Sequence, residues 1–200
     1  MPDETLADFA GRVAAPAPAP GGGAVAAVVA ALAAALSAMV AGLALARKPE
    51  GEGSGLAELV GSADRVRTSL LQLAREDEAA YARVIEARRS GDERALAGAW
   101  REAARIPAEV VRLSREAAQL ARRAAREGPR AALGDAAMAA LLAAAAAAGS
   151  QINLRFNVQA AGRPEGLRML ADRTEVELRE AQHAATEVRL LVEQELGGKN

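Results

Sequence analysis

Several residue types that carry chemistry are scarce or missing in this sequence. It has no cysteine and a single histidine, His183, among 200 residues. Disulfides and thiol catalysis are therefore excluded, and a metal cage of His and Cys ligands cannot be built, so we expect no metal. No basic tract with interleaved aromatic residues suggests a nucleic-acid surface. The polar, acidic opening MPDETLADFAGRV does not resemble a secretory signal.

Alanine supplies most of the apolar residues, which make up 51% of the chain, whereas aromatic residues make up 2%. Alanine is the best helix former, and few segments alternate apolar and polar residues as strands do. We predict an all-α, multihelical bundle that forms one domain over residues 1–200. Proline and glycine breaks divide the chain into six expected helices, at residues 5–14, 21–47, 56–89, 92–128, 135–160 and 164–197. Pro107 should kink or interrupt the fourth of them.

Two of the expected helices contain long uncharged segments. Ala24–Ala46 has 23 residues without a charge, and Ala136–Leu154 has 19. Their lengths would allow membrane spans. However, 12 of the 23 residues in the first segment are alanine, and neither segment has an aromatic belt or a flanking basic cluster. We therefore expect a buried central pair wrapped by amphipathic helices, and no membrane contact.

Asp77 interrupts an apolar stripe on the third expected helix. The stripe has helical spacing and consists of Leu59, Val66, Leu70, Leu73, Tyr81 and Val84. A carboxylate that faces a core is unfavourable unless it is paired or neutral. Asp77 is therefore either a buried acceptor for a neighbouring helix or an acid or base of a site.

Three other features could serve structure or ligand binding. Asp135, before an alanine run, has the position of a helix N-cap. Asn153 and Asn157 lie one turn apart and could bond across the bundle or hold a polar ligand. The triple glycine Gly21, Gly22 and Gly23 precedes a helix start. It is either a hinge or a turn whose backbone N–H groups suit an anion.

Together these segments resemble the cyclodeaminase/cyclohydrolase family of folate enzymes. PAPGGGAVAA at residues 18–27 resembles the family's P-x-P-G-G-G-S-V-A-A opening. The other matches follow in the family's order and span nearly the whole chain: Met39-Val40-Ala41, DEAAY at 77–81, PAEV at 107–110, DAAMAALL at 135–142 and NLRFN at 153–157.

The resemblance implies an all-helical bundle that is usually a homodimer, and a tetrahydrofolate derivative as substrate with no separate cofactor. It implies either cyclodeamination of 5-formiminotetrahydrofolate or hydrolysis of 5,10-methenyltetrahydrofolate. Folate chemistry and the absence of a signal favour the cytoplasm. The sequence departs from the family at Ala24, Gly134 and the end of the second helix, where Lys48 remains of a lysine-rich segment. A catalytically silent, folate-binding or merely dimeric bundle is therefore the alternative.

In this interpretation a carboxyl group performs the acid and base steps. We expect Asp135 to be the general acid/base, helped by Lys48, and Asp77 to orient the pterin or a water. Lys48, Asn153, Asn157 and the glycine turn Gly21–Gly23 would bind the substrate. Asp135 and Asn153 are separated by 18 residues, or roughly 27 Å along a straight helix. One folate cannot span that distance compactly, which favours a site between two subunits.

Overall fold

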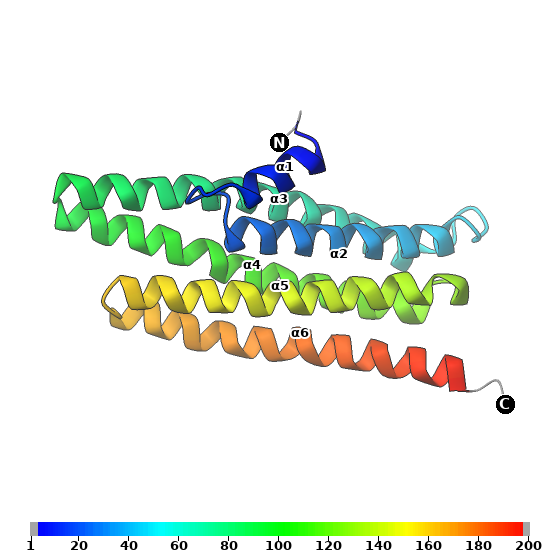
Figure 1. Ribbon diagram of the computed structural model, residues 1–200. Helices are drawn as coiled ribbons and strands as arrows, with labels where there is room; N and C mark the ends of the chain where they lie inside the picture. Colours follow the sequence, from blue (N-terminus) through cyan, green and yellow to red (C-terminus); the bar gives the residue numbers. More distant parts are fainter. Residues whose placement is uncertain (1–3, 198–200) are drawn as a thin grey trace.

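The computed structural model describes residues 4–197, which form six α-helices and one short 3-10 helix and contain no strand (Figure 1). The predicted all-α class is confirmed. The elements are α1 (Leu6–Ala14), α2 (Gly22–Leu45), α3 (Ser54–Ser90), α4 (Glu93–Glu127), η1 (Arg130–Ala132), α5 (Leu133–Ala160) and α6 (Glu165–Gly197).

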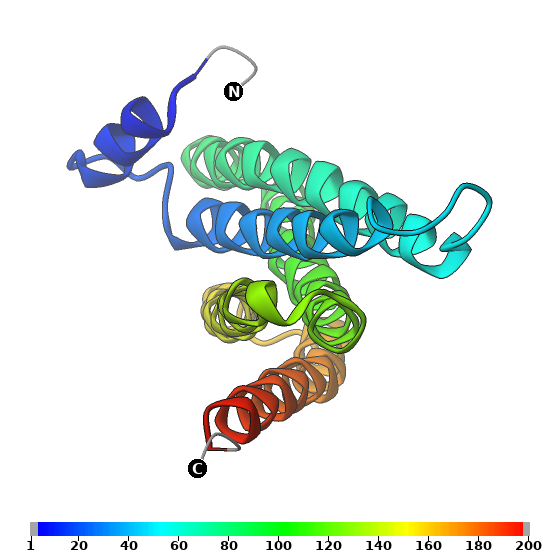
Figure 2. The ribbon, with the colours of Figure 1, turned by 90° about the vertical axis from the view of Figure 1, so that its right-hand side faces the viewer.

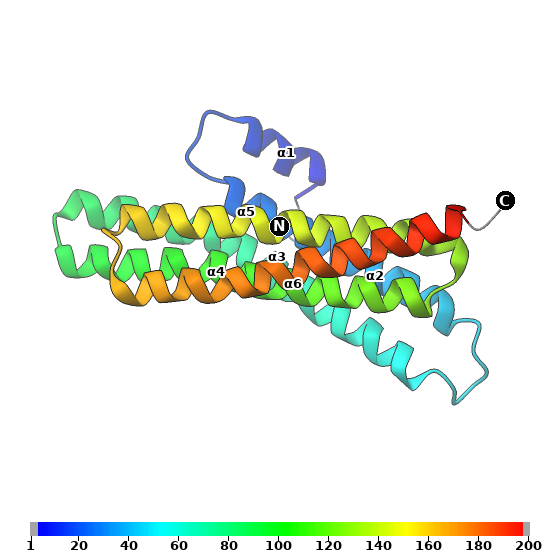
Figure 3. The same cartoon turned by 90° about the horizontal axis from the view of Figure 1, so that it is seen from below.

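The long helices pack side by side as an elongated bundle (Figures 1 and 2). α4 packs against α2, α3, α5 and α6, and α2 and α5 also pack against each other. Helix α1 is different, because it projects from the side of the bundle opposite α4 (Figures 2 and 3). The segment between α1 and α2 contains the alternating prolines and forms no regular helix.

Helices α2 and α5 run antiparallel. Gly22, at the start of α2, lies beside Asn153 near the end of α5, whereas Val40 packs with Ala136 at the start of α5. Both helices line the core with fully buried alanines, whose small side chains allow the close packing that the composition suggested.

The amphipathic helices pack against α2 and α5, as expected, but they do not enclose either helix completely. By length and composition both helices could span a membrane, yet each lies only partly inside the bundle. Their sides facing away from α4 remain exposed and carry Leu32, Met39, Met138 and Leu141, which are each about half exposed.

Several predicted helix ends are confirmed, and of the two effects expected of Pro107 the interruption of α4 does not occur. Thr5 and Asp8 form a reciprocal capping box at α1, and Asp92 accepts hydrogen bonds from the first turn of α4. However, α4 continues through Pro107 without interruption. Tyr81, expected on the apolar stripe of α3, is 43% exposed.

Candidate functional site

The first turn of α2 packs directly against Asp77 of α3. A Cβ atom at Gly23 would lie 2.6 Å from both Cγ and Oδ2 of Asp77, which is closer than real Cβ contacts. The backbone of Gly23 is not in the left-handed region, so the close approach of the carboxyl group, rather than strain, requires glycine here. The carboxyl group occupies the space that a side chain would fill.

Asp77 is half buried, and burial raises the pKa of its carboxyl group above the usual value of 3.8. A hydrogen bond from the backbone N–H of Ala24 opposes this shift, and the neighbouring charge of Glu78 adds to it. The open N–H groups of a helix start favour a carboxylate. Asp77 is thus a carboxyl group that holds a proton more readily than an exposed aspartate and can also release it beside α2.

Asn153 of α5 completes the same corner. A Cβ at Gly22 would meet its Nδ2 at 3.5 Å and its Oδ1 at 3.7 Å, which are ordinary contact distances. Helices α2, α3 and α5 therefore bring together four residues: Gly22, Gly23, Asp77 and Asn153. Gly22 and Asn153 are 131 positions apart in the chain. The corner combines a carboxyl group, an amide and the N–H groups of a helix start.

Asn157, one turn further along α5, has a structural partner. Its Nδ2 donates a 2.6 Å hydrogen bond to the carbonyl of Ala103 on α4. Pro107 has no N–H, so it cannot make the helical bond to the carbonyl four residues earlier. Asn157 thus satisfies the carbonyl that Pro107 leaves free. Asn157 and Pro107 were both singled out from the sequence, but the link between them depends on the packing of α5 against α4.

Asp135 and Lys48 lie at the other end of the α2–α5 pair. Asp135 is exposed in the first turn of α5, where Ala132 is the N-cap residue. The prediction that Asp135 is an N-cap is therefore wrong, because α5 begins earlier, after the 3-10 turn. Lys48 is exposed just beyond α2. Within one chain, neither residue lies at the corner formed by Asp77 and Asn153.

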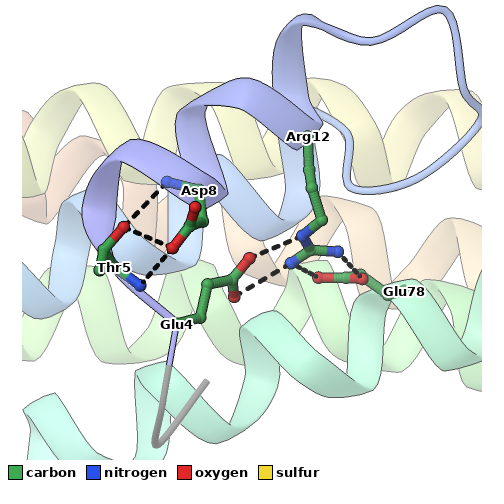
Figure 4. Close-up of polar contacts among 5 residues, drawn as sticks. All are labelled: Glu4, Thr5, Asp8, Arg12 and Glu78. Carbon is green, nitrogen blue, oxygen red and sulfur yellow. Dashed lines mark hydrogen bonds and ion pairs between the residues drawn. The ribbon is translucent and has the colours of Figure 1, made fainter.

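An ion pair that the sequence analysis missed ties α1 to the helix carrying Asp77. Arg12 donates to Glu4 at 2.7 Å and to Glu78 of α3 at 2.8 Å (Figure 4). These hydrogen bonds, with Glu78 contributing most, raise the pKa of the Arg12 guanidinium above its usual range. Phe9 of the same helix is buried, and Arg12 lies over its ring. Helix α1 is thus anchored next to Asp77.

An open groove of about 830 Å³ lies between the end of α5 and the start of α6. Its lining includes the exposed apolar side chains of Ile152 and Phe156, which lie within three residues of Asn153 on α5. Arg155, Arg163 and Arg168 also line it and form no ion pair with any residue from 4 to 197. Glu165 and Asp172 belong to the same lining, so the groove offers apolar contacts together with charged groups of both signs, the positive ones in excess.

Comparison with known proteins agrees with this architecture. The family model for formiminotransferase-cyclodeaminase matches residues 5–176. A crystal structure of formiminotetrahydrofolate cyclodeaminase from Thermotoga maritima superposes with a TM-score of 0.89 at 29% identity, covering 98% of both chains. No curated protein sequence matches.

The fold and the site together define a class of protein: an all-helical bundle in which a glycine-rich helix start packs against a half-buried carboxyl group. The chain belongs to the formiminotransferase-cyclodeaminase family. Membership in this family and the structural match support an enzyme of folate one-carbon metabolism as its general class.

Proposed function

We propose that this protein is a formiminotetrahydrofolate cyclodeaminase whose reaction takes place at the corner formed by α2, α3 and α5. The observation that carries the proposal is the approach of Gly23 to Asp77, which holds a carboxyl group of raised pKa against an open helix start. Asn153 at the same corner supplies an amide for a polar ring such as a pterin. The similar Thermotoga protein is a formiminotetrahydrofolate cyclodeaminase, which favours deamination over hydrolysis.

The reaction requires a proton to move between two nitrogens. N10 of the substrate attacks the formimino carbon bound to N5, and a new C–N bond closes the ring. The bond from that carbon to the departing nitrogen then breaks, and ammonia leaves. When the formimino group is in its protonated amidinium form, its nitrogen already carries two hydrogens; N10 then loses one proton, the departing nitrogen gains one and leaves as ammonia, and the positive charge remains on the methenyl product, so a single carboxyl group can relay the proton. This proposal gives Asp77 the relay, in place of the orienting role expected from the sequence.

The remaining groups bind the substrate in this proposal. The N–H groups of Gly22 and Gly23 and the side chain of Asn153 orient the pterin. The p-aminobenzoyl ring follows the apolar side chains of the neighbouring groove, and its arginines pair with the glutamate carboxylates. Asn157 supports the site indirectly, because its Nδ2 is committed to α4.

The test adds purified protein to 5-formiminotetrahydrofolate and follows the absorbance of the methenyl product. The expected result is a protein-dependent gain that Asp77→Asn reduces by about 10²-fold or more, the contribution typical of a general acid or base. Asp64→Asn is the matched control, because Asp64 is an exposed carboxylate on α3 that pairs with Arg67.

Three other outcomes would change the proposal. Loss of absorbance from 5,10-methenyltetrahydrofolate, without any gain from the formimino substrate, would identify a cyclohydrolase instead. Turnover that is unaffected by Asp77→Asn would remove Asp77 from the chemistry. Folate binding without turnover of either substrate would leave the catalytically silent bundle as the function. Binding would be measured by titrating the protein with folate and following the fluorescence of its single tryptophan, Trp100.

A further inference from the structure

Tyr81 is an exposed aromatic side chain next to the candidate site. It follows Asp77 by four residues on α3, so the two side chains leave the helix about 40° apart in direction and roughly 6 Å apart along its axis. On the same apolar stripe Leu73 and Val84 are 5% and 2% exposed, whereas Tyr81 is 43% exposed. The cover of the stripe therefore has a gap at Tyr81, one turn beyond Asp77.

The exposure of Tyr81 follows from the place where α2 begins. Gly23, in the first turn of α2, faces Asp77, and Leu45, at the end of α2, lies beside the N-cap residue of α3. The two helices therefore run antiparallel, and the position level with Tyr81 lies four residues before Gly23. That position belongs to the segment that forms no regular helix. Figure 1 shows α3, α4 and α5 continuing past the start of α2, so α2 does not extend over Tyr81.

Tyr81 lies on the opposite side of the corner from the groove beside α6. Helix α2 packs against α3 on one side and α5 on the other, and α5 packs against α6. Across the bundle the order is therefore α3, α2, α5 and α6 (Figures 1 and 2). Asp77 and Tyr81 belong to α3, Asn153 belongs to α5, and the groove lies beyond Asn153, between α5 and α6. A ligand whose tail occupies the groove has its other end toward α3.

The proposed substrate has its reacting carbon between two ring systems. N5 belongs to the pterin, and N10 carries the p-aminobenzoyl group. With the p-aminobenzoyl ring in the groove and the reacting carbon at Asp77, the pterin extends toward α3. Tyr81 is the only aromatic residue in the sequence of α3. A flat heterocycle gains from stacking on an aromatic side chain, while amides and backbone N–H groups bond to its polar edge.

We propose that Tyr81 is a substrate-binding residue whose ring stacks on the pterin while Asp77 acts one helical turn away. This inference rests on the proposed function for the identity of the ligand. It assigns the glycine turn and Asn153 to the edge of the pterin and Tyr81 to its face. The stack requires the ring of Tyr81 and not its hydroxyl group, and this requirement separates the inference from a hydrogen-bonding role.

The first experiment observes Tyr81 directly and does not depend on turnover. The chain has a single tyrosine, so incorporation of 3-fluorotyrosine gives one ¹⁹F resonance that reports on Tyr81. The probe is 5-formyltetrahydrofolate, which has no formimino nitrogen to release. Its addition should shift the resonance saturably and give a ¹⁹F–¹H Overhauser contact with the protons at C7 of the pterin. The fragment 6-hydroxymethylpterin should shift the same resonance, whereas p-aminobenzoylglutamate should not.

The second experiment removes the ring and then restores it. Tyr81→Ala should raise KM for 5-formiminotetrahydrofolate by about 10-fold, within the roughly 5- to 150-fold that stacking of one base on an aromatic side chain is worth. The kcat should change by less than about twofold, since the stack forms in both the ground state and the transition state. Tyr81→Phe keeps the ring and should recover the lost affinity. Leu190→Ala on α6, where Leu190 is 47% exposed, is the matched control and should change neither constant.

Several results would overturn the inference. Tyr81→Phe with the same rise in KM as Tyr81→Ala would show that the hydroxyl group, rather than the ring, binds the substrate. An unchanged KM in Tyr81→Ala would remove the residue from the site. A ¹⁹F resonance that responds to p-aminobenzoylglutamate but not to 6-hydroxymethylpterin would place the wrong end of the substrate at α3. Should Tyr81→Ala fail to fold, the ¹⁹F experiment on the unsubstituted chain still decides.

The same measurements separate this inference from the proposed function. A protein that turns over 5-formiminotetrahydrofolate in an Asp77-dependent manner, but whose ¹⁹F resonance ignores every pterin, would refute the inference and leave the proposed function. A protein that shows the Overhauser contact with 5-formyltetrahydrofolate, but converts neither folate substrate, would refute the proposed function and leave Tyr81 as a pterin-binding residue.

Discussion

Replacing Gly23 with alanine tests the contact on which the candidate site depends. The added Cβ would lie 2.6 Å from two atoms of the Asp77 carboxyl group. Asp77 has a short side chain next to the core, so it must move away from the N–H of Ala24. Overpacking of this kind costs about 1–3 kcal/mol, while the gain in helix propensity from glycine to alanine is at most about 1 kcal/mol. We expect Gly23→Ala to be destabilising overall.

A double-mutant cycle isolates the clash from the helix propensity. In an Asp77→Ala background the new methyl group meets no carboxyl group, so Gly23→Ala should be neutral or stabilising by up to about 1 kcal/mol. The coupling between the two positions should therefore be about 1–3 kcal/mol. Because 1 kcal/mol corresponds to about 2–4 °C in a domain of this size, thermal unfolding of the four proteins resolves it.

Gly22→Ala is the matched control, because its added methyl group would make only ordinary contact with Asn153 at 3.5 Å. It should leave the unfolding temperature unchanged or slightly raised. The reasoning fails if Gly23→Ala changes the unfolding temperature by the same amount with and without Asp77. Such a result would mean that Gly23 is only a hinge after the proline segment.

Three further predictions concern the surroundings of the site. Asn157→Ala should destabilise the protein by about 1–3 kcal/mol, since it leaves the buried Ala103 carbonyl unpaired. In a Pro107→Ala background the restored helical N–H should reduce that loss, as denaturant unfolding would show; equal losses would contradict the pairing. Burial raises the pKa of Asp77, so the folded protein binds that proton more tightly and its stability falls as the pH rises through the folded pKa. Asp77→Asn should therefore be most stabilising near neutral pH, and its advantage should shrink toward pH 3.8; an advantage that grows in acid would be inconsistent with burial. Arg12→Ala should accelerate proteolysis in the segment 15–20 with little change in unfolding temperature, because exposed ion pairs contribute at most about 1 kcal/mol. Arg67→Ala, which breaks a pair within α3, should leave that cleavage rate unchanged.

Local sequence features predicted most of the helices because their causes are local. Prolines and glycines mark the breaks, and the Thr5–Asp8 capping box and the Asp92 cap each involve residues a few positions apart. Asp135 was assigned wrongly as a cap because η1 and the start of α5 precede it. The sequence left open whether Pro107 kinks or interrupts α4, since the group that satisfies the free carbonyl comes from Asn157 on another helix.

The candidate site was predicted as a set of residues but not as an arrangement. The motif residues Gly22, Gly23, Asp77 and Asn153 were all singled out from the sequence, and they do meet at one corner. Their separation from Asp135 followed from helix rise alone. The arginines of the groove beside α6 were missed, because scattered arginines on helical sequences usually indicate solvated surface and nothing local distinguishes these three.

The sequence by itself determined that the chain is helical, where the helices break, and which segments are too apolar to face water on all sides. These properties depend on backbone propensity and on side-chain chemistry within a few residues. Only the tertiary structure decided which side of α2 and α5 is covered and which atoms face Asp77. Those contacts join residues far apart in the chain, and they are set by the order in which antiparallel helices pack.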